Sequence, residues 1–135
     1  MFRKKLNEVI CLDFDGVIHP FTTPFKDWGI IPDPPVEGAL EWMFDAIQTV
    51  DISVLSVRSN YFTGRAGMRS WLKRHAEEMD LWDPPSKAHR GLKHVEFPTS
   101  KPAACIYIDD RGFRFEGKFP PLRQLLALKT WEQRR

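Results

Sequence analysis

Cysteine is scarce in this sequence, and long hydrophobic runs are missing from it. The 2 cysteines, Cys11 and Cys105, each lie in a short apolar run typical of a buried strand. This pattern excludes a disulfide-rich scaffold and predicts buried, reduced thiols in a reducing compartment. No segment reaches the roughly 18 consecutive apolar residues of a transmembrane helix, and polar residues interrupt the start too early for a signal peptide. We therefore expect a cytoplasmic protein that is neither secreted nor membrane-spanning.

An excess of charge of one sign is also missing. The 20 basic and 18 acidic residues give a net charge of +2, which is too small to indicate nucleic-acid binding by bulk electrostatics and leaves room only for a local basic patch. The hydrophobic fraction of 42% and the charged fraction of 28% are those of a globular protein. At 135 residues without an internal repeat, the chain is expected to form a single domain over 1–135.

Strand-like and helix-like segments alternate along the chain. We expect strands over 8–15, 52–56 and 103–109, a brief strand over 94–97, and helices over 36–49, 63–79 and 122–131. The segments 17–35 and 81–93 are rich in proline and are expected to be loops. This alternation predicts an α/β fold in which helices cover a parallel sheet connected by right-handed crossovers.

Polar side chains stand where three of these strands end. They are Asp13 and Asp15, then Ser56, then Asp109 and Asp110. Because ligands of open α/β sheets bind at the carboxyl ends of the strands, we expect these side chains to converge on one site.

The carboxylates at these strand ends predict a metal site with a nucleophile. Asp13 and Asp15 face one pocket if the first strand continues that far, whereas a turn at Gly16 would give Asp15 a different role. Together with Asp109 they would repel one another unless a cation lay between them, and oxygen ligands suit Mg²⁺. The cation and Lys101 would neutralise a phosphate, so that a carboxylate could attack its phosphorus.

Four segments together indicate a family. They are Asp13-Phe-Asp15-Gly-Val17, Val54-Leu-Ser56, Lys101, and Ile108-Asp109-Asp110. In this order they resemble the motifs of the haloacid dehalogenase (HAD) superfamily of aspartyl-phosphate phosphohydrolases, and the chain is similar to its short, cap-poor bacterial and phage members. The resemblance covers 9–110. It implies a three-layer, Rossmann-like parallel sheet with helices on both faces and a minimal cap.

The resemblance also implies catalytic roles. Asp13 would be phosphorylated, and Asp15 would protonate the leaving group and then activate water. Ser56 would hold a phosphoryl oxygen, and Lys101 would steady the nucleophile and the phosphate. Covalent catalysis of this kind divides one difficult displacement into two easier ones.

The same resemblance implies a Mg²⁺ site. Asp109 would bind the ion together with the Asp13 side chain and the Asp15 carbonyl, and Asp110 would hold a metal-bound water or the lysine. The expected activity is that of a magnesium-dependent phosphatase that hydrolyses phosphomonoesters. Two other functions stay open, namely a nucleic-acid end phosphatase and a non-catalytic module that binds a phosphorylated ligand.

Several residues compete for contact with the phosphate. Ser59 or Arg58 is the alternative to Ser56, which would then be an ordinary turn serine. His19 either contacts substrate from the first loop or is a packing residue.

The choice of lysine is also open. Lys87 and Lys93 compete with Lys101, which lies closer to a strand. The basic run 87–94 either contacts a nucleic-acid backbone or, as we favour, is a solvated loop that balances nearby acids.

The two proline-rich loops are too short for a separate cap domain. An open site predicts a bulky phosphorylated substrate, a covering partner subunit, or a lid formed by the aromatic residues Phe21, Phe25 and Trp28 of the flap-like loop 17–35. The sequence indicates neither the physiological substrate nor the oligomeric state.

Overall fold

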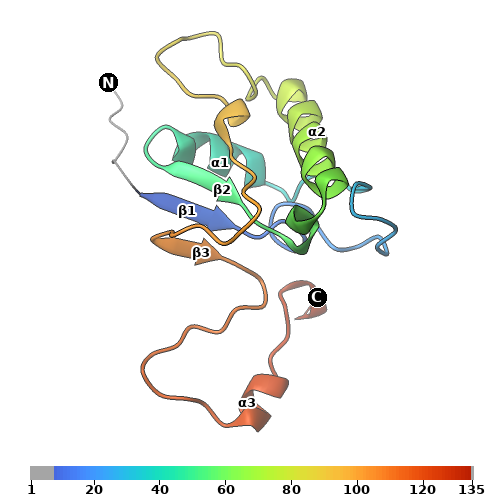
Figure 1. Cartoon of the computed structure of the whole chain (residues 1–135), viewed down its shortest axis with the longest axis vertical. Helices are drawn as coiled ribbons and strands as arrows, with labels where there is room; N and C mark the ends of the chain where they lie inside the picture. Colours follow the sequence, from blue (N-terminus) through green and yellow to red (C-terminus); the bar gives the residue numbers. More distant parts are fainter. Residues whose placement is uncertain (1–7, 135) are drawn as a thin grey trace.

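The computed structural model describes residues 8–134. Its elements are the strands β1 (Val9–Leu12), β2 (Asp51–Val54) and β3 (Ile106–Ile108), the helices α1 (Ala39–Ile47), α2 (Phe62–Glu78) and α3 (Leu122–Leu126), and the 3₁₀ turns η1 (Val57–Asn60), η2 (Leu92–His94) and η3 (Glu132–Arg134). Strands and helices alternate as the sequence predicts, and the fold is therefore α/β (Figure 1).

A parallel sheet holds the first strand at its centre. The strand order is β2-β1-β3, and Leu12 pairs with both Val54 and Ile108. The residues that follow Leu12, Val54 and Ile108 therefore leave the sheet at the same edge, as predicted from the sequence. A single parallel bridge between Ser53 and Glu96 stands where the brief strand over 94–97 was expected.

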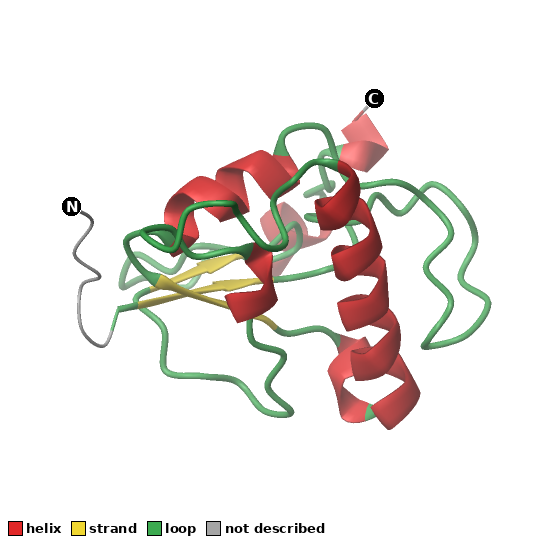
Figure 2. Ribbon diagram, turned by 90° about the horizontal axis from the view of Figure 1, so that it is seen from above, coloured by secondary structure: helices red, strands yellow, loops and turns green. Residues whose placement is uncertain are grey.

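The hydrophobic core lies between the sheet and the first two helices. Alternate residues of β2, Ile52 and Val54, enter the same buried cluster as apolar residues of α1 and α2. Those helix residues are Leu40, Met43, Ile47, Met68, Trp71, Leu72 and Ala76. Their spacing of three or four residues gives each helix one apolar face toward the core. Figure 2 shows the short strands side by side among these helices and the loops.

The C-terminal part of the chain is less regular than its sequence predicts. The expected helix over 122–131 is reduced to α3. Leu122 and Leu126 are 68% and 76% exposed. A helix this short depends on packing of its apolar side chains, and here they have no core to pack against.

The sheet is smaller than the resemblance implies. Three short strands confirm the α/β class, and the three-layer arrangement with helices on both faces stays a prediction. The expected buried thiol is confirmed at Cys11 and wrong at Cys105, which is exposed because it adjoins the edge strand β3. Among the described residues, no helix combines the length and the apolar character needed to cross a membrane.

Candidate active site

Three carboxylates meet at the carboxyl edge of the sheet. Asp13 follows β1, and its backbone N–H still donates to the carbonyl of Ile108, 2.9 Å away. Asp109 and Asp110 follow β3, the neighbouring parallel strand. One carboxylate oxygen from each aspartate lies within 4.8 Å of the others. The predicted convergence of Asp13 and Asp109 is therefore present in the structure, with Asp110 as the third member.

A glycine makes room for the third carboxylate. Gly16 has a φ of +90°, and a Cβ built on it would lie 2.3 Å from Oδ2 of Asp110. A larger residue at this position would therefore require the Asp110 carboxylate to shift. The other oxygen of this carboxylate, Oδ1, is buried without a hydrogen-bond partner.

The electrostatics of the cluster favour a bound cation. The pKa of Asp13 is raised to about 7, chiefly by burial and also by the neighbouring carboxylates of Asp110 and Asp109, against the opposing effect of the hydrogen bond from the Phe14 N–H. A divalent cation would offset the repulsion among these carboxylates and give Oδ1 of Asp110 a partner. The three residues therefore fit the hard, oxygen-bound ion that the sequence predicts.

Asp15 points away from this cluster. The first strand ends at Leu12, and the chain turns at Gly16, which is the alternative that gives Asp15 a different role. Its carboxylate accepts hydrogen bonds from Nε of Arg58 at 2.8 Å and from Nδ1 of His19 at 2.9 Å. Burial alone would raise the pKa of Asp15, but the bonds from His19 and Arg58 outweigh it and lower the pKa.

Arg58 is buried and holds the loop 17–35 through hydrogen bonds. It is 2% exposed, and besides Asp15 its guanidinium donates to the carbonyls of Asp27, Trp28 and Ile30 at 3.1, 2.6 and 3.2 Å. Most of its N–H groups are thus occupied within the protein. A contact of Arg58 with substrate stays a prediction, while its contact with the flap-like loop is direct.

His19 lies behind Asp15 in the interior. Its side chain is buried, and Nε2 accepts the backbone N–H of Asp33, so Nδ1 carries the proton that is donated to Asp15. The ring stacks on Phe14 with 5.6 Å between centroids. These contacts correspond to the packing alternative for His19, and they fix the orientation of the Asp15 carboxylate.

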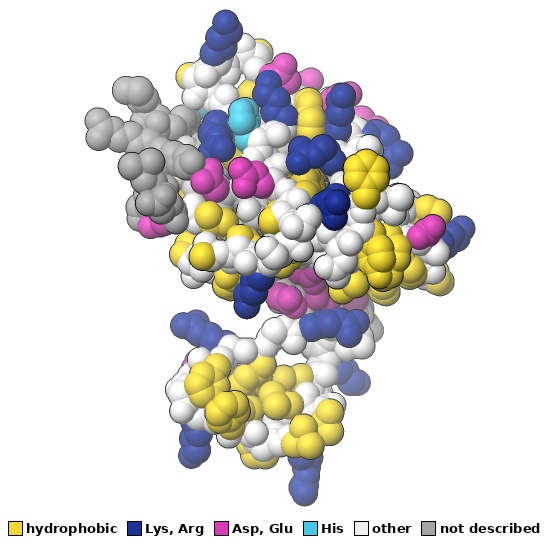
Figure 3. Space-filling model, viewed as in Figure 1, with side chains coloured by type: hydrophobic (Ala, Val, Ile, Leu, Met, Phe, Trp, Pro, Cys, Tyr) yellow, Lys and Arg dark blue, Asp and Glu magenta, His cyan; other side chains and the backbone are white. Residues whose placement is uncertain are grey.

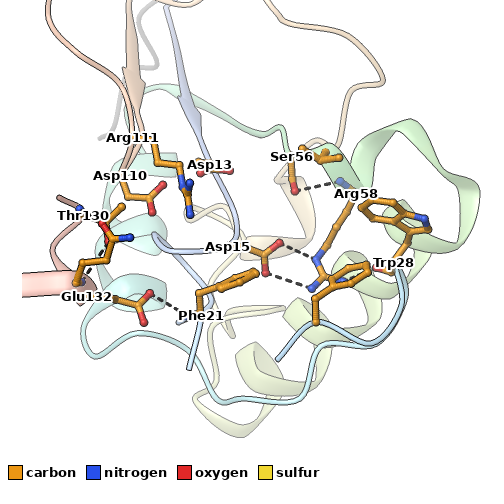
Figure 4. A pocket seen from close by; sticks show the side chains of 13 residues that line it. Asp13, Asp15, Phe21, Trp28, Ser56, Arg58, Asp110, Arg111, Thr130 and Glu132 are labelled. Atoms are coloured by element: carbon orange, nitrogen blue, oxygen red, sulfur yellow. Dashed lines mark hydrogen bonds and ion pairs between the residues drawn. The ribbon is translucent and has the colours of Figure 1, made fainter. Parts of the chain in front are cut away.

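The carboxylates open into a cavity of about 550 Å³. Figure 4 shows Asp13 and Asp110 on one side of it and Asp15 with Arg58 on the other. Its remaining lining residues are Phe21, Phe25, Trp28, Ser56, Val57, Arg111, Thr130, Glu132 and Gln133. The three aromatic residues expected to act as a lid therefore border the cavity, and whether they move stays a prediction.

The C-terminal segment forms part of the cavity wall. The indole N–H of Trp131 donates to the carbonyl of Gly16 at 2.6 Å, and Glu132 accepts the backbone N–H of Phe21 at 2.9 Å. Residues 130–133 are thereby fastened to the loop that carries Asp13 and Asp15. This wall was not predicted from the sequence, because nothing in the composition of 122–131 indicates that the segment returns to the first loop.

Of the two candidate serines, only Ser56 faces the cavity. Its Oγ accepts the backbone N–H of Arg58 at 3.1 Å, which leaves the hydroxyl proton to point elsewhere. Ser59 is completely buried, and its Oγ accepts the backbone N–H of Ser56. The position of Ser59 argues against its contact with a phosphate.

Lys101 lies on a neighbouring hollow of about 490 Å³ that also reaches Asp13, Ser56 and Asp109. Its ammonium lies 4.5 Å from the ring centre of Tyr107. Lysine side chains are long and flexible, so this position is compatible with a later contact to phosphate.

The alternative lysines lie elsewhere. Lys93 pairs with Asp83 at 2.8 Å, and Lys87 lines a separate hollow with Asp83. This pairing is what a solvated loop that balances nearby acids would show.

Arg111 also belongs to the site, although it was not predicted from the sequence as a site residue. It lines both the cavity and the neighbouring hollow, and its backbone N–H donates to Oδ1 of Asp109 at 2.6 Å. Its position directly after Asp109 and Asp110 was a usable signal, because a cation at the same strand end faces the same site.

Comparisons with protein-family models, curated proteins and solved structures found no match.

Proposed function

We propose that this protein is a magnesium-dependent phosphatase that hydrolyses phosphomonoesters through an aspartyl phosphate on Asp13. The observation that carries the proposal is the half-buried Asp13 carboxylate, which lies against two further carboxylates at the wall of an open cavity. The unsatisfied buried oxygen of Asp110 supports a cation at this point. The resemblance to the HAD superfamily agrees with this activity. We also propose that the protein has the three-layer fold that this resemblance implies.

Two displacements at phosphorus would complete the reaction. In the first, an oxygen of Asp13 forms a bond to phosphorus while the ester bond to the leaving oxygen breaks. In the second, water adds its oxygen to phosphorus and the bond to Asp13 breaks, which releases inorganic phosphate and restores the carboxylate. The Ser56 hydroxyl can donate to a phosphoryl oxygen, and Arg111 and Lys101 can offset its negative charge.

Asp13, Asp109 and Asp110 would hold the magnesium ion. When bound, the ion supplies positive charge that lets an anionic phosphate approach an anionic nucleophile. The Asp15 carbonyl, implied as a further ligand, stays part of the proposal.

Asp15 is better placed to accept a proton than to donate one. Its carboxylate is held ionised by Arg58 and His19, so it is in the form that can accept a proton from the attacking water. To protonate the leaving oxygen, it would first have to take up a proton and weaken its bond to Arg58. The proposal therefore favours phosphoesters whose leaving groups are stable as anions, such as aryl esters.

Phosphate release from a panel of small aryl and alkyl phosphomonoesters tests the proposal. Wild type is expected to release phosphate with Mg²⁺ and to stop when EDTA is added. Asp13→Asn is expected to lose at least about 10³-fold in kcat, because the nucleophile is removed. Asp83→Asn removes an exposed carboxylate in the loop that carries Lys93 and serves as the matched control with unchanged turnover. Equal turnover by wild type and Asp13→Asn would refute the assignment of Asp13 as the nucleophile. If wild type released phosphate from no ester, a module that binds a phosphorylated ligand would be favoured.

A further inference from the structure

The chain between the carboxylate cluster and the C-terminal wall stands apart from the body of the protein. We call residues 111–129 the arm. Figure 1 shows that the arm leaves the end of β3, carries α3, and returns near the sheet only at its C-terminal end. Its apolar side chains are strongly exposed, with Phe115 at 54%, Phe119 at 86% and Leu126 at 76%. A large exposed apolar patch of this kind is more often a binding site than part of the ordinary solvent-exposed surface.

The charge of the arm is as uneven as its polarity. Its basic residues are Arg111, Arg114, Lys118, Arg123 and Lys129, and its only acidic residue is Glu116. Among residues 8–134, no acidic group lies within ion-pair distance of these basic side chains. The remainder of the chain is consequently acidic overall, since the whole carries only +2. The arm is therefore a local basic patch of the kind that the small net charge left open.

Aromatic and basic side chains share one hollow on the arm. The hollow has a volume of about 660 Å³, and its lining includes Phe113, Phe119, Arg114 and Lys118. In Figure 3 the part of the molecule that holds the arm shows hydrophobic side chains in the middle and Lys and Arg side chains around them. Exposed aromatic faces that stack on bases, next to cations that contact phosphates, are the two components of single-strand recognition.

The arm is continuous with the candidate active site. Arg111 lines the cavity at Asp13 and is also the first residue of the arm. Arg114 lies three positions further along the chain, a span of at most about 10 Å. A polymer whose terminal phosphate lies at Asp13 would therefore reach the hollow of the arm with its adjoining nucleotides.

Charge decides between the occupants. A second copy of this chain that packed arm against arm would bring the same basic side chains against one another, which costs free energy unless they are separated by bound anions. A nucleic acid offers the opposite charge together with bases that can cover the phenylalanines. We propose that the arm binds single-stranded nucleic acid beside a terminal phosphate held at Asp13. This inference rests on the proposed function and assigns its substrate class as a phosphorylated nucleic-acid end.

Fluorescence anisotropy with labelled oligothymidylate and oligouridylate, both without a terminal phosphate, tests the arm independently of hydrolysis. Phe113→Ala/Phe119→Ala is expected to raise the Kd by about 5- to 150-fold, the effect of losing one stacked base. Arg114→Gln/Lys118→Gln is expected to weaken binding and to flatten the slope of log K against log salt by about 1.4, as for two lost phosphate contacts. The two polymers together show whether the arm distinguishes DNA from RNA.

Matched variants control for charge and for exposed aromatic area. Lys73→Gln/Lys87→Gln removes two positive charges away from the arm, and Phe62→Ala removes a ring that is 77% exposed at the start of α2. Both are expected to bind oligonucleotide as wild type does. A thermal melt of each variant verifies that it is folded.

Several results would overturn the inference. They are a wild type that does not bind either oligonucleotide, arm variants that bind as tightly as wild type, and a dimer that dissociates on Phe113→Ala/Phe119→Ala while no oligonucleotide binds. The last result would assign the arm to a second copy of the chain.

Hydrolysis separates this inference from the proposed function. The arm variants are expected to lose kcat/KM on an oligonucleotide with a terminal phosphate and to keep it on a small aryl phosphate. Hydrolysis of the small ester without oligonucleotide binding would leave the proposed function standing and overturn the role of the arm. Oligonucleotide binding without hydrolysis of any ester would support the ligand of the arm and contradict the proposed function.

Discussion

Replacing Asp15 by asparagine should destabilise the fold as well as slow the reaction. The substitution removes the only carboxylate that the structure places in an ion pair with Arg58, within the described residues. Arg58 is 2% exposed, so its charge cannot turn to solvent without releasing the loop carbonyls that it binds. Loss of one partner from a buried ion pair costs about 3–5 kcal/mol. Because the asparagine oxygen still accepts one hydrogen bond, we expect about 3 kcal/mol, which lowers the Tm by about 10 °C.

The loss should depend on pH in a defined direction. Asp15 has a folded-state pKa below its ordinary value of 3.8. The stabilisation by its ionised form is therefore fully present above the unfolded pKa and disappears as the pH falls through the folded pKa. Wild type and Asp15→Asn should differ most near pH 7, begin to converge as the pH falls below about 4, and become similar only below the folded-state pKa.

Urea denaturation followed by tryptophan fluorescence at several pH values measures both effects. Asp83→Asn, which removes an exposed partner of Lys93, should leave the free energy of unfolding almost unchanged, because exposed ion pairs contribute little to stability. Arg58→Met combined with Asp15→Asn should recover part of the loss, since the unpaired buried charge is then gone. An Asp15→Asn protein within about 1 kcal/mol of wild type at pH 7 would refute the buried-pair argument.

Three further changes probe the carboxylate cluster and its surroundings. Asp13 has a pKa raised to about 7, so in metal-free protein its ionisation lowers the free energy of unfolding as the pH rises from about 4 to 7. Asp13→Asn should therefore raise the free energy of unfolding at pH 8 by about 1 kcal/mol after allowance for solvent screening. An unchanged free energy of unfolding at pH 8 would contradict this expectation. Gly16→Ala should cost about 2 kcal/mol in a urea titration, because the position has a φ of +90° and the new methyl group would displace Asp110; a cost near zero would mean that the cluster tolerates the displacement. Trp131→Phe removes the hydrogen bond to the Gly16 carbonyl and should cost about 1 kcal/mol and increase proteolysis of the C-terminal segment, whereas unaltered proteolysis would show that the indole does not fasten it.

The convergence of the carboxylates was predictable from the sequence. Each of the three strands is a short apolar run that ends in polar residues, and parallel pairing brings their carboxyl ends together. The register that joins Leu12 to Val54 and Ile108 is the structural basis of that prediction.

The direction of Asp15 depended on one turn. The sequence analysis left open whether the first strand would continue or the chain would turn at Gly16, and that choice decides whether Asp15 joins Asp13 or pairs with Arg58. The pairing partner lies 43 residues away, and it is supplied by the turn after β2, whose geometry does not follow from hydrophobic periodicity.

The C-terminal region was the least predictable part. Its helical periodicity over 122–131 assumes a core that would bury one face, and the arm has no such core. The return of Trp131 to Gly16 joins residues 115 positions apart through a single side chain. No local pattern carries that information.

The central claim is that Asp13 forms a covalent bond to phosphorus. Acid quenching during turnover of an aryl phosphate with Mg²⁺, followed by borohydride reduction and peptide mass spectrometry, tests it directly, because borohydride converts an aspartyl phosphate to homoserine. We predict homoserine at position 13, dependent on both substrate and Mg²⁺. Phosphate release that proceeds with an unmodified Asp13, or with the modification at another carboxylate, would contradict the claim.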